Sequence, residues 1–429
     1  MIKTYEIRDP IHGFIVINDW EREIINHPVF QRLRRIRQLA WTDMVYPGAM
    51  HTRFEHSLGV MHVATEMFKQ VARRRQSFLE SELNYTTSGL DRDLVLVRLA
   101  SLLHDVGHAP FSHAGEGLMP INTDTDKPYK HEYYSAAAIT YLLADVIENH
   151  QLNQNYGIKA RDIADFLNGR ASVGRALLWR GLVSSQLDAD RADYLLRDSH
   201  HIGVAYGRYD LQRLLFTITV ANDRETDSPT LAVEEGGMHA AEGLILARYM
   251  MFTQVYFQHT RRAYDYHIAG AIKTLLPSTR FPPPTSVQSL NKYLAWNDWR
   301  VLGLIDDSGG GNDGRILRER NHHRRVYETP ENPQQADIQL FQEVLKELGQ
   351  DVVLVDRAES SWYKFEKDDI PILRRSAGAK ESLKPLSSLS SVVHGLKAVN
   401  QMRIYASHCD KGRARKFVDT ILRERGGLS

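Results

Sequence analysis

Histidines and acidic residues gather in four short segments of the first half of the chain. These segments are residues 53–57, 104–113, 131–132 and 188–194. Imidazole and carboxylate groups together bind borderline or hard divalent metals and leave room for water beside the ion. Because water bound to such a metal becomes a hydroxide near neutral pH, the four segments favour metal-dependent hydrolysis of a phosphate ester.

The adjacent residues His104 and Asp105 stand where a buried helix should end. Residues 94–106 are apolar almost all round, which predicts a central helix whose last turn contains the pair. A buried carboxylate without a partner is costly, and a cation satisfies it. Neighbouring helical side chains point about 100° apart, so both reach one ion at the helix edge. His56 and one later aspartate would complete the ligand set, and the spacing leaves three candidates open: Asp188, Asp190 and Asp193.

The same residues also have a purely structural interpretation. A single buried histidine is more often a satisfied core residue than a ligand, and an aspartate at a helix end is often a cap. That interpretation explains each residue alone but not the whole set within so short a stretch. The set comprises His56, His104, Asp105, His108, His113 and His131.

Helices must position most of these side chains. Residues 1–20 alternate weakly around Asp9-Pro10 and Gly13, which predicts a short hairpin. From Trp20 to Leu276 the pattern is helical, with one long helix expected over residues 238–276. The run Phe-Pro-Pro-Pro that begins at Phe281 breaks this pattern. We therefore expect a mainly α fold with an all-helical core over residues 1–280.

A smaller α+β subdomain is expected over residues 281–429. Helical segments and a glycine-rich loop at 309–311 come first, and strand-like runs follow at 352–355 and 402–405. A final helix ends near Arg423.

Composition limits the kinds of function that the chain can have. A formal net charge of +1 argues against a large nucleic-acid footprint. The basic cluster at residues 32–37 leaves a nucleotide or a single strand open as a ligand. The N-terminus has no apolar signal core, and no apolar stretch is long enough to cross a bilayer. One cysteine excludes an internal disulfide. We expect a soluble, cytoplasmic protein with no membrane partner.

Several long motifs in this chain resemble those of the HD superfamily. They are residues 9–13 (Asp-Pro-Ile-His-Gly), 30–34 (Phe-Gln-Arg-Leu-Arg), 46–49 (Tyr-Pro-Gly-Ala) and 53–59. The chain is most similar to the deoxynucleoside triphosphate triphosphohydrolases typified by the sterile-alpha-motif/HD-domain enzyme, here without the sterile alpha motif. The resemblance covers nearly the whole chain and extends to its C-terminal strand and helix.

The resemblance assigns a role to each part of the site. It implies the metal ligands His56, His104, Asp105 and Asp190, which hold a divalent Fe, Mn, Zn, Ni or Mg ion, with a second Mg²⁺ on the triphosphate. It implies a catalytic pair of His131 and Glu116, where the family has aspartate, and His113 as the proton donor to the leaving 5′-oxygen. The implied substrate contacts are Gln38, Leu39, Arg53, His108, Arg191, Tyr194, Asp198 and Tyr264. Of these, Gln38 and Asp198 would hold the 3′-hydroxyl, and Leu39 and Tyr264 would enclose the sugar.

Helix spacing supports part of this assignment without the resemblance. Asp190, Tyr194 and Asp198 fall four residues apart, broadly on one face of one helix. A metal ligand, a phosphate contact and a sugar contact would then follow one another along it. The structural alternative is a half-buried Tyr194 and a solvated Asp198.

The chain departs from the family at the positions that bind regulatory nucleotides between subunits. Gln31 and Arg34 match the first of these allosteric sites, but Asn26 replaces an aspartate that would bind a guanine edge. An amide cannot accept two hydrogen bonds there as a carboxylate can. The basic residues of the second site are replaced by Glu242, Leu244, His323 and Tyr327, and Tyr256 replaces an arginine near the terminal phosphate. The need for a nucleotide activator is therefore left open, while a homodimer or homotetramer is expected from the resemblance.

Three functions compete at this point. The favoured one is hydrolysis of a deoxynucleoside triphosphate to a deoxynucleoside and inorganic triphosphate. The alternatives are another phosphohydrolase of the same superfamily, such as a phosphodiesterase or nuclease, and a nucleotide-sensing regulatory protein. The residues do not distinguish nucleotide homeostasis from defence against phage as the biological role.

Overall fold

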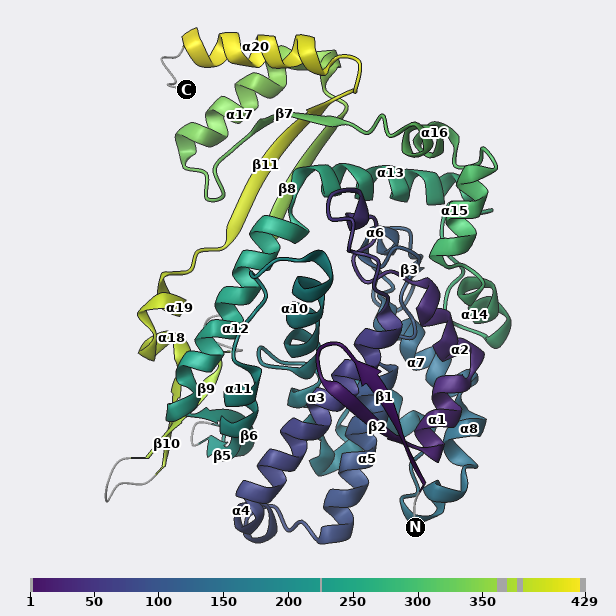
Figure 1. Ribbon diagram of the computed structural model, residues 1–429, viewed down its shortest axis with the longest axis vertical. Coiled ribbons are helices and arrows are strands. Elements are labelled where there is room, and N and C mark those ends of the chain that lie inside the picture. The colour runs from purple at the N-terminus through teal and green to yellow at the C-terminus, as the bar shows by residue number, and fades with distance from the viewer. Residues whose placement is uncertain (1–2, 224–225, 361–368, 376–380, 425–429) are drawn as a thin grey trace.

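The computed structural model describes residues 3–223, 226–360, 369–375 and 381–424. Helices dominate the body, and a small sheet with two helices lies at the end that contains the C-terminus (Figure 1). The expectation of a mainly α fold with an N-terminal hairpin and a C-terminal α+β part is confirmed. In the described part of the chain, no helix has the length and apolar character that crossing a membrane requires.

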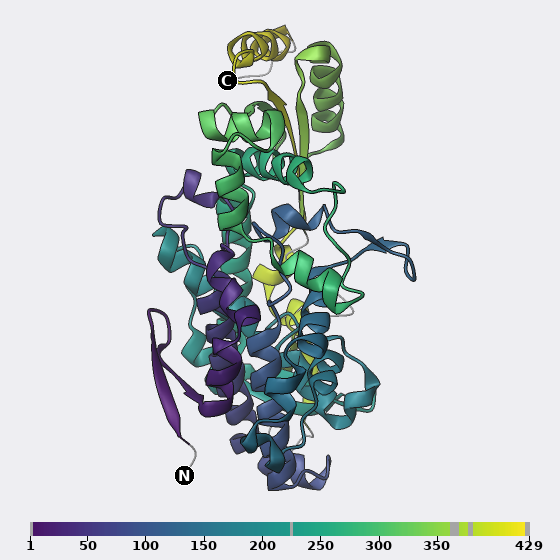
Figure 2. The same cartoon turned by 90° about the vertical axis from the view of Figure 1, so that its right-hand side faces the viewer.

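The predicted hairpin consists of β1 (Thr4–Asp9) and β2 (Gly13–Asn18), which pair antiparallel. Gly13 lies in the left-handed region at φ 79°, which a glycine adopts at little cost. Ile15 and Ile17 on one face of β2 are buried in the main core. The hairpin lies along the outside of the helical body (Figure 2). Asn18 then caps α1 (Asp19–Asn26) through a capping box with Glu21.

Three helices form the centre of the body: α3 (Arg53–Arg74), α5 (Thr87–Leu103) and α10 (Ala189–Ile202). α3 packs against both α5 and α10. Their contact faces bury Met61, Leu99 and Leu195 completely. The other elements up to residue 217 are α2 (Pro28–Gln31), η1 (Arg32–Arg35), η2 (Thr42–Met44), α4 (Gln76–Ser81), α6 (His113–Glu116), β3 (Ile121–Asn122), β4 (Lys127–Pro128), α7 (His131–Tyr141), α8 (Ala144–Glu148), η3 (Gln151–Asn155), α9 (Ala160–Leu167), η4 (Ala171–Leu182) and α11 (Leu211–Thr217).

The long helix expected over residues 238–276 is interrupted. It consists of α12 (Met238–Met251), a π-helical turn η6 (Phe252–Tyr256) and α13 (His259–Leu275). The side chain of Gln258 accepts a hydrogen bond from the Arg261 amide and so begins a new helix. A π turn widens the helix locally and is frequent near functional sites.

Two strands inside the region expected to be helical were missed. β5 (Ile218–Asp223) and β6 (Ser228–Glu234) form a hairpin after η4 and α11, followed by η5 (Glu235–Gly237). β6 also pairs in parallel with β9 (Pro371–Arg374), which lies far along the chain and pairs with β10 (Ser382–Pro385). Pairing across such a distance leaves no trace in a local sequence pattern.

The C-terminal sheet has the order β7 (Arg324–Glu328), β11 (Val399–Ala406) and β8 (Leu354–Ser360). The helices α17 (Gln335–Leu348) and α20 (Lys411–Glu424) pack on it around Val344, Ile404 and Val418, which form a small separate core. The strand expected at 402–405 and the closing helix are thus present, whereas the strand expected at 352–355 lies later, because β8 begins at Leu354. The other elements of this part are α14 (Val287–Leu294), α15 (Asp298–Asp306), α16 (Gly311–Glu319), η7 (Gly349–Asp351), α18 (Leu386–Leu389) and α19 (Ser391–Gly395).

The main core continues past residue 280. Tyr293 is fully buried and donates a hydrogen bond to the Gly107 carbonyl at 2.7 Å. Arg32, also buried, donates to the carbonyls of His108 and Trp296. The division of the chain at residue 280 stays a prediction, and these contacts tie its two sides together.

Asp298 ties the start of α15 to two loops of the body. Its carboxylate accepts hydrogen bonds from the backbone amides of Arg37, at 2.8 Å, and Phe111, at 2.7 Å. Phe111 and Ser112 both have positive φ, so this loop holds a conformation that L-residues rarely adopt alone. Burial raises the pKa of Asp298 to about 6.

We predict that Asp298→Ala destabilises the fold more at pH 5 than at pH 7.5. At pH 5 the loss should be about 1–3 kcal/mol, because two buried amides lose their acceptor. A pKa raised in the folded state means that the wild-type carboxyl contributes less stability as pH rises from about 4 through about 6. Urea unfolding at both pH values measures the difference. Asp306→Ala, at an exposed position of the same helix, is the control, and a deficit that grows with pH would contradict the prediction.

Candidate metal centre

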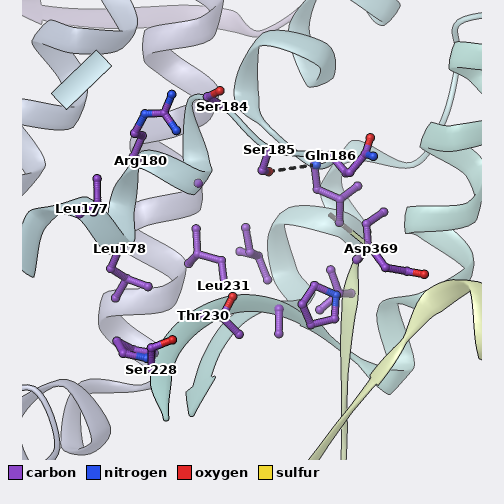
Figure 3. A pocket seen from close by; sticks show the side chains of 18 of the residues that line it. Leu177, Leu178, Arg180, Ser184, Ser185, Gln186, Ser228, Thr230, Leu231 and Asp369 are labelled. Carbon is purple, nitrogen blue, oxygen red and sulfur yellow. Dashed lines mark hydrogen bonds between the residues drawn. The ribbon is translucent and has the colours of Figure 1, made fainter. Parts of the chain in front are cut away.

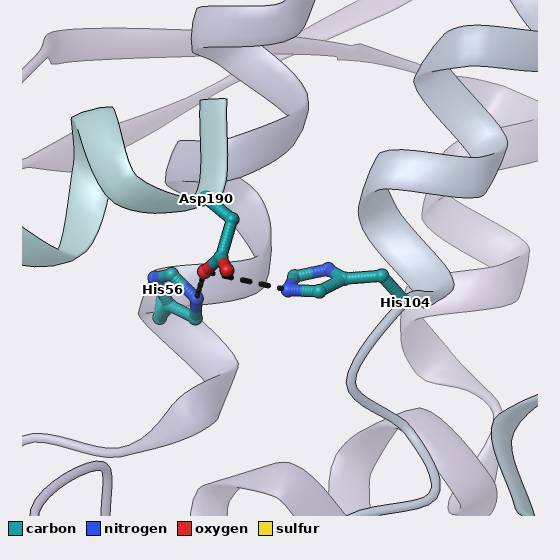
Figure 4. A group of neighbouring side chains, drawn as sticks. All are labelled: His56, His104 and Asp190. Carbon is teal, nitrogen blue, oxygen red and sulfur yellow. Dashed lines mark hydrogen bonds and ion pairs between the residues drawn. The ribbon is translucent and has the colours of Figure 1, made fainter. Parts of the chain in front are cut away.

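Side chains from three helices converge on one point between α3, α5 and α10. His56 comes from α3, His104 from the end of α5 and Asp190 from the first turn of α10 (Figure 4). His56 Nε2 lies 3.0 Å from Asp190 Oδ1, and His104 Nε2 lies 3.9 Å from the same oxygen. One ligand atom from each residue falls within 4.8 Å of the others, which is close enough for all three to hold a single ion.

Asp105 adds a fourth potential ligand. Its carboxylate oxygens lie 3.7 Å from His56 Nε2 and 3.3 Å from His104 Nε2. The helix ends at Leu103, one turn earlier than expected, so His104 is its C-cap and Asp105 lies in the turn that follows. The Gly107 amide donates to Ser135 Oγ instead of continuing the helix, and a Cβ at Gly107 would meet the Ser135 amide nitrogen at 2.2 Å. Close packing of this turn against α7 therefore ends the helix.

The state of His104 fits a metal ligand. Its Nδ1 bonds the Ser101 carbonyl at 2.7 Å, which fixes the proton on that nitrogen. Its Nε2 is buried and has no hydrogen-bond partner within the described residues. A buried ring nitrogen without a hydrogen bond is costly, and a cation bound between it and the two nearby carboxylates would satisfy all three groups. The donor set of two imidazoles and two carboxylates suits a divalent ion of intermediate hardness.

Asp193 holds the far side of the His56 ring. His56 Nδ1 donates to Asp193 Oδ2 at 2.8 Å, which leaves Nε2 facing the centre. Asp193 also accepts two hydrogen bonds from Arg197 and one from His12 Nε2 at 2.7 Å. Burial disfavours the charge, but Arg197 outweighs it and holds the pKa of Asp193 well below its ordinary value. A carboxylate behind a ligating histidine fixes the ring and raises its basicity.

The three aspartates that spacing could not separate therefore have three different environments. Asp190 faces the ligand group, Asp193 supports His56, and Asp188 caps α10 by accepting from the Arg191 amide. Gly59 makes the approach of Asp193 to α3 feasible, because a Cβ there would lie 1.9 Å from Asp193 Oδ1. The supporting role of Asp193 was missed in the sequence, because it depends on the close approach of α10 to α3.

Next to this group stands a second cluster, Asp105, His108 and His131. The His108 and His131 rings stack with centroids 3.8 Å apart, and His108 Nε2 lies 3.3 Å from Asp105. Glu116 accepts from His131 Nδ1 at 2.5 Å. The expected pairing of His131 with Glu116 is thus present as a direct contact.

Glu116 holds a second histidine as well. His113 Nδ1 lies 2.9 Å from its other carboxylate oxygen, and the His113 side chain is 67% exposed. Burial disfavours the ionised carboxylate, but the two histidines outweigh it and hold the pKa of Glu116 far below its ordinary value. Burial also disfavours the charged His131, yet Glu116 raises its pKa above the ordinary value. One ionised carboxylate therefore orients two rings at the edge of the centre.

The expected phosphate contacts surround the centre unevenly. Arg53 is buried and donates to Asp105 at 2.5 Å and to Ser112 Oγ at 2.8 Å. Arg191 turns away from the ligand group and donates to Asp188 and to the Ser185 carbonyl. Tyr194 is half-buried one turn further along α10.

The expected sugar contacts form a buried wall beyond Tyr194. Asp198 accepts from His51 Nε2 at 2.7 Å and from the Tyr256 hydroxyl at 2.6 Å. Leu39 and Tyr264 are buried, while Gln38 Oε1 and the Tyr264 hydroxyl have no partner within the described residues. The sequence did not identify His51 as a site residue, and it marked Tyr256 only as a replacement for arginine.

The residues of the first expected allosteric site lie together on the surface near the C-terminal end of α1. Gln31 donates to the Ile25 carbonyl at 2.7 Å, and Arg34 donates to Gln31 at 2.9 Å. The Arg34 guanidinium lies 3.5 Å from the centre of the Phe54 ring, and Asn26 is exposed. Their role as a nucleotide site stays a prediction.

Asp193→Asn should weaken metal binding about 10–100-fold, because His56 loses the anion that orients it. Calorimetric titration of the metal-free full chain with Mn²⁺ measures this directly. Asp210→Asn is the matched control, since Asp210 caps the separate helix α11 through its side chain. A variant that keeps native near-ultraviolet circular dichroism and binds the metal as tightly as the wild type would refute the supporting role.

Comparison with known proteins covers almost the whole chain. Residues 53–198 match the HD domain, and residues 209–422 match the HD associated region. The uncharacterized protein YwfO of Bacillus subtilis is 30% identical over 417 residues, which cover 91% of this chain and 88% of that protein. A crystal structure of a hypothetical protein from Aquifex aeolicus superposes with a TM-score of 0.78 at 28% identity and covers 96% of this chain and 99% of that one.

A relative with a stated activity matches over a shorter span. The deoxynucleoside triphosphate triphosphohydrolase SAMHD1 of Mus musculus is 30% identical over 323 residues, which are 70% of this chain and 47% of that protein. This chain thus matches about half the length of that enzyme. The HD match begins at Arg53 and ends at Asp198, so it contains both the ligand group and the second cluster described above. The chain belongs to the HD-domain phosphohydrolase family, in the branch that includes the SAMHD1 proteins.

Proposed function

We propose that this protein hydrolyses deoxynucleoside triphosphates to deoxynucleosides and inorganic triphosphate. The observation that carries the proposal is the order in which three side chains follow one another along α10. Asp190 faces the ligand group, Tyr194 follows one turn later, and Asp198 lies in the buried wall one turn beyond. Successive turns lie about 5.4 Å apart, which matches the scale on which a nucleotide presents phosphate and sugar.

The α-phosphate is the group that the centre would act on. His56, His104, Asp105 and Asp190 would hold a divalent ion, which supplies Lewis-acid activation of the phosphate and of a water molecule. Arg53 and His108 stand beside this point, both fully enclosed by protein. A fixed guanidinium in a site shielded from water stabilises phosphate charge far better than it would in bulk water.

Departure of the nucleoside requires a proton at its 5′-oxygen. The His113 side chain is largely exposed and its Nδ1 is held by Glu116, so its Nε2 is the ring nitrogen left for a substrate. The same carboxylate raises the pKa of His131 against the effect of burial. A positioned imidazole of this kind transfers a proton efficiently near neutral pH.

The residues expected to contact the sugar favour a deoxynucleotide as the substrate. Asp198 already accepts from His51 and Tyr256, but each carboxylate oxygen has two lone pairs, so one remains for a 3′-hydroxyl. The buried side chains of Leu39 and Tyr264 would pack closely around the sugar, where an added 2′-hydroxyl would have to be accommodated. Assembly as a homodimer or homotetramer, and activation by a nucleotide, remain parts of the same proposal.

Incubation of the Mn²⁺-loaded protein with each deoxynucleoside triphosphate, singly and in pairs, should release inorganic triphosphate, identified by phosphorus NMR. His104→Ala should abolish the product because it removes a ligand. His239→Ala, at an exposed histidine on α12, should retain it. Activity in pairs alone would reveal an activator. Pyrophosphate plus monophosphate would favour another phosphohydrolase activity, and binding without any product would favour the nucleotide sensor.

Glu116→Gln should lower kcat on the order of 10²–10⁴-fold with little change in KM. The amide cannot accept from both histidines, and His131 loses the charge that raises its pKa. Glu132→Gln provides the matched control, since Glu132 is an exposed carboxylate 3.6 Å from the same ring. Equal losses in the two variants would show that Glu116 has no special role.

A further inference from the structure

A large cavity lies beside the metal centre but outside it. It has a volume of about 840 Å³, within the range of roughly 300–1,000 Å³ that is usual for small-molecule sites. Its walls come from η4, from residues 184–187 before α10, from β5 and β6, and from residues 369–371 (Figure 3). None of the four expected metal ligands lines it. Arg191 is the one residue among the expected substrate contacts that does.

The middle of the cavity is aliphatic. Leu178, Leu187, Ile218 and Leu231 face it, and Figure 3 shows Leu231 opposite Arg180 and Ser184. Among the described residues that line the cavity, none is aromatic. A nucleobase is usually held by stacking on a ring, whereas an alkyl chain needs only aliphatic walls. The lining therefore favours an alkyl chain over a second nucleotide.

The charged residues of the cavity favour an anion. Arginines 175, 180, 191 and 248 line it against one carboxylate, that of Asp369. Arg191 and Arg248 lie at the end nearest α10, and Arg191 Nε is buried without a hydrogen-bond partner in the described part of the chain. Burial lowers the pKa of Arg248, and the nearby charge of Arg191 lowers it further. An anion between the two guanidinium groups would relieve both effects.

The same end of the cavity connects to the metal centre through the start of α10. Arg191 donates to Asp188 and to the Ser185 carbonyl, and Asp188 caps the helix by accepting from the amides of Ser185 and Arg191. Asp190, which faces the ligand group, lies between them in the chain. An anion on Arg191 would thus act within one residue of the centre.

We propose that this cavity binds a small amphiphile with an alkyl chain and an anionic head, whose head lies between Arg191 and Arg248. The chain extends along Leu231 toward η4. The bound head holds Arg191 away from the triphosphate, which it would otherwise contact, so the ligand inhibits hydrolysis. This last effect rests on the proposed function, whereas binding itself does not.

Isothermal titration calorimetry of the full chain with dodecyl phosphate and with dodecanoate, below their micelle concentrations, tests binding. At least one should bind saturably with one molecule per chain, and the comparison separates a phosphate head from a carboxylate head. Dodecyltrimethylammonium, which has the same chain and the opposite charge, should not bind. Failure of both anions, or equal binding of the cation, overturns the proposal.

Two variants locate the site. Leu231→Trp fills the aliphatic part and should weaken binding at least tenfold, while Arg248→Gln should weaken it severalfold by removing part of the head site. Val287→Trp adds the same ring at an exposed position of α14 and should leave binding unchanged. Circular dichroism establishes that each variant is folded. Undiminished binding in both cavity variants would place the ligand elsewhere.

The effect of the bound amphiphile on the metal centre is measured separately, as inhibition of triphosphate release. Saturating ligand should inhibit triphosphate release by the wild type and have at least tenfold less effect at the same concentration on Leu231→Trp. Ligand binding that leaves the rate of an active wild type unchanged overturns the link. If no triphosphate is released under any condition, the proposed function fails, and the calorimetric result still decides whether the cavity binds the amphiphile.

Discussion

The structure depends on one buried ion pair, between Asp193 and Arg197 on successive turns of α10. Asp193 reaches α3 through His56 and the hairpin loop through His12, and Arg197 reaches the same loop through Asp9. Breaking a buried pair of this kind leaves an uncompensated charge, which is strongly unfavourable. The central helices and the hairpin are therefore held at fixed distances by groups that cannot separate. A metal site at this point needs that rigidity, because its candidate ligands come from α3, from the end of α5 and the turn after it, and from α10.

The helix ends are as important as the helices themselves. α5 stops at Leu103 because the following turn packs against α7 through Gly107, and that stop turns His104 and Asp105 toward Asp190. α10 begins at its Asp188 cap, which places Asp190 in the first turn. Each candidate ligand thus lies at or near the end of a helix, where the backbone no longer makes the full set of helical hydrogen bonds. The centre therefore requires the C-terminal end of α5 to lie next to the N-terminal end of α10.

Much of this arrangement could be read from the sequence, because local chemistry determines it. The clustered histidines, the apolar helix before His104 and the hairpin around Gly13 all follow from short patterns. What the sequence could not supply depends on distant partners. The hairpin of β5 and β6 is stabilised by a strand near residue 372, and the support of His56 by Asp193 requires α3 and α10 to be in place. Spacing on α10 could not choose among three aspartates, since their neighbours on other elements distinguish them.

The bond from Asp298 to the Phe111 amide spans 187 residues of the chain. A ribosome adds about 5–20 residues per second, so on the order of 10 to 40 s separate the synthesis of these two partners. During that interval the loop at residues 111–113 lacks the acceptor that fixes its unusual backbone. The nascent chain therefore emerges with α3, α5 and α10 complete, while this loop still lacks its partner. Synthesis itself therefore delays completion of the candidate site until the start of α15 has been made.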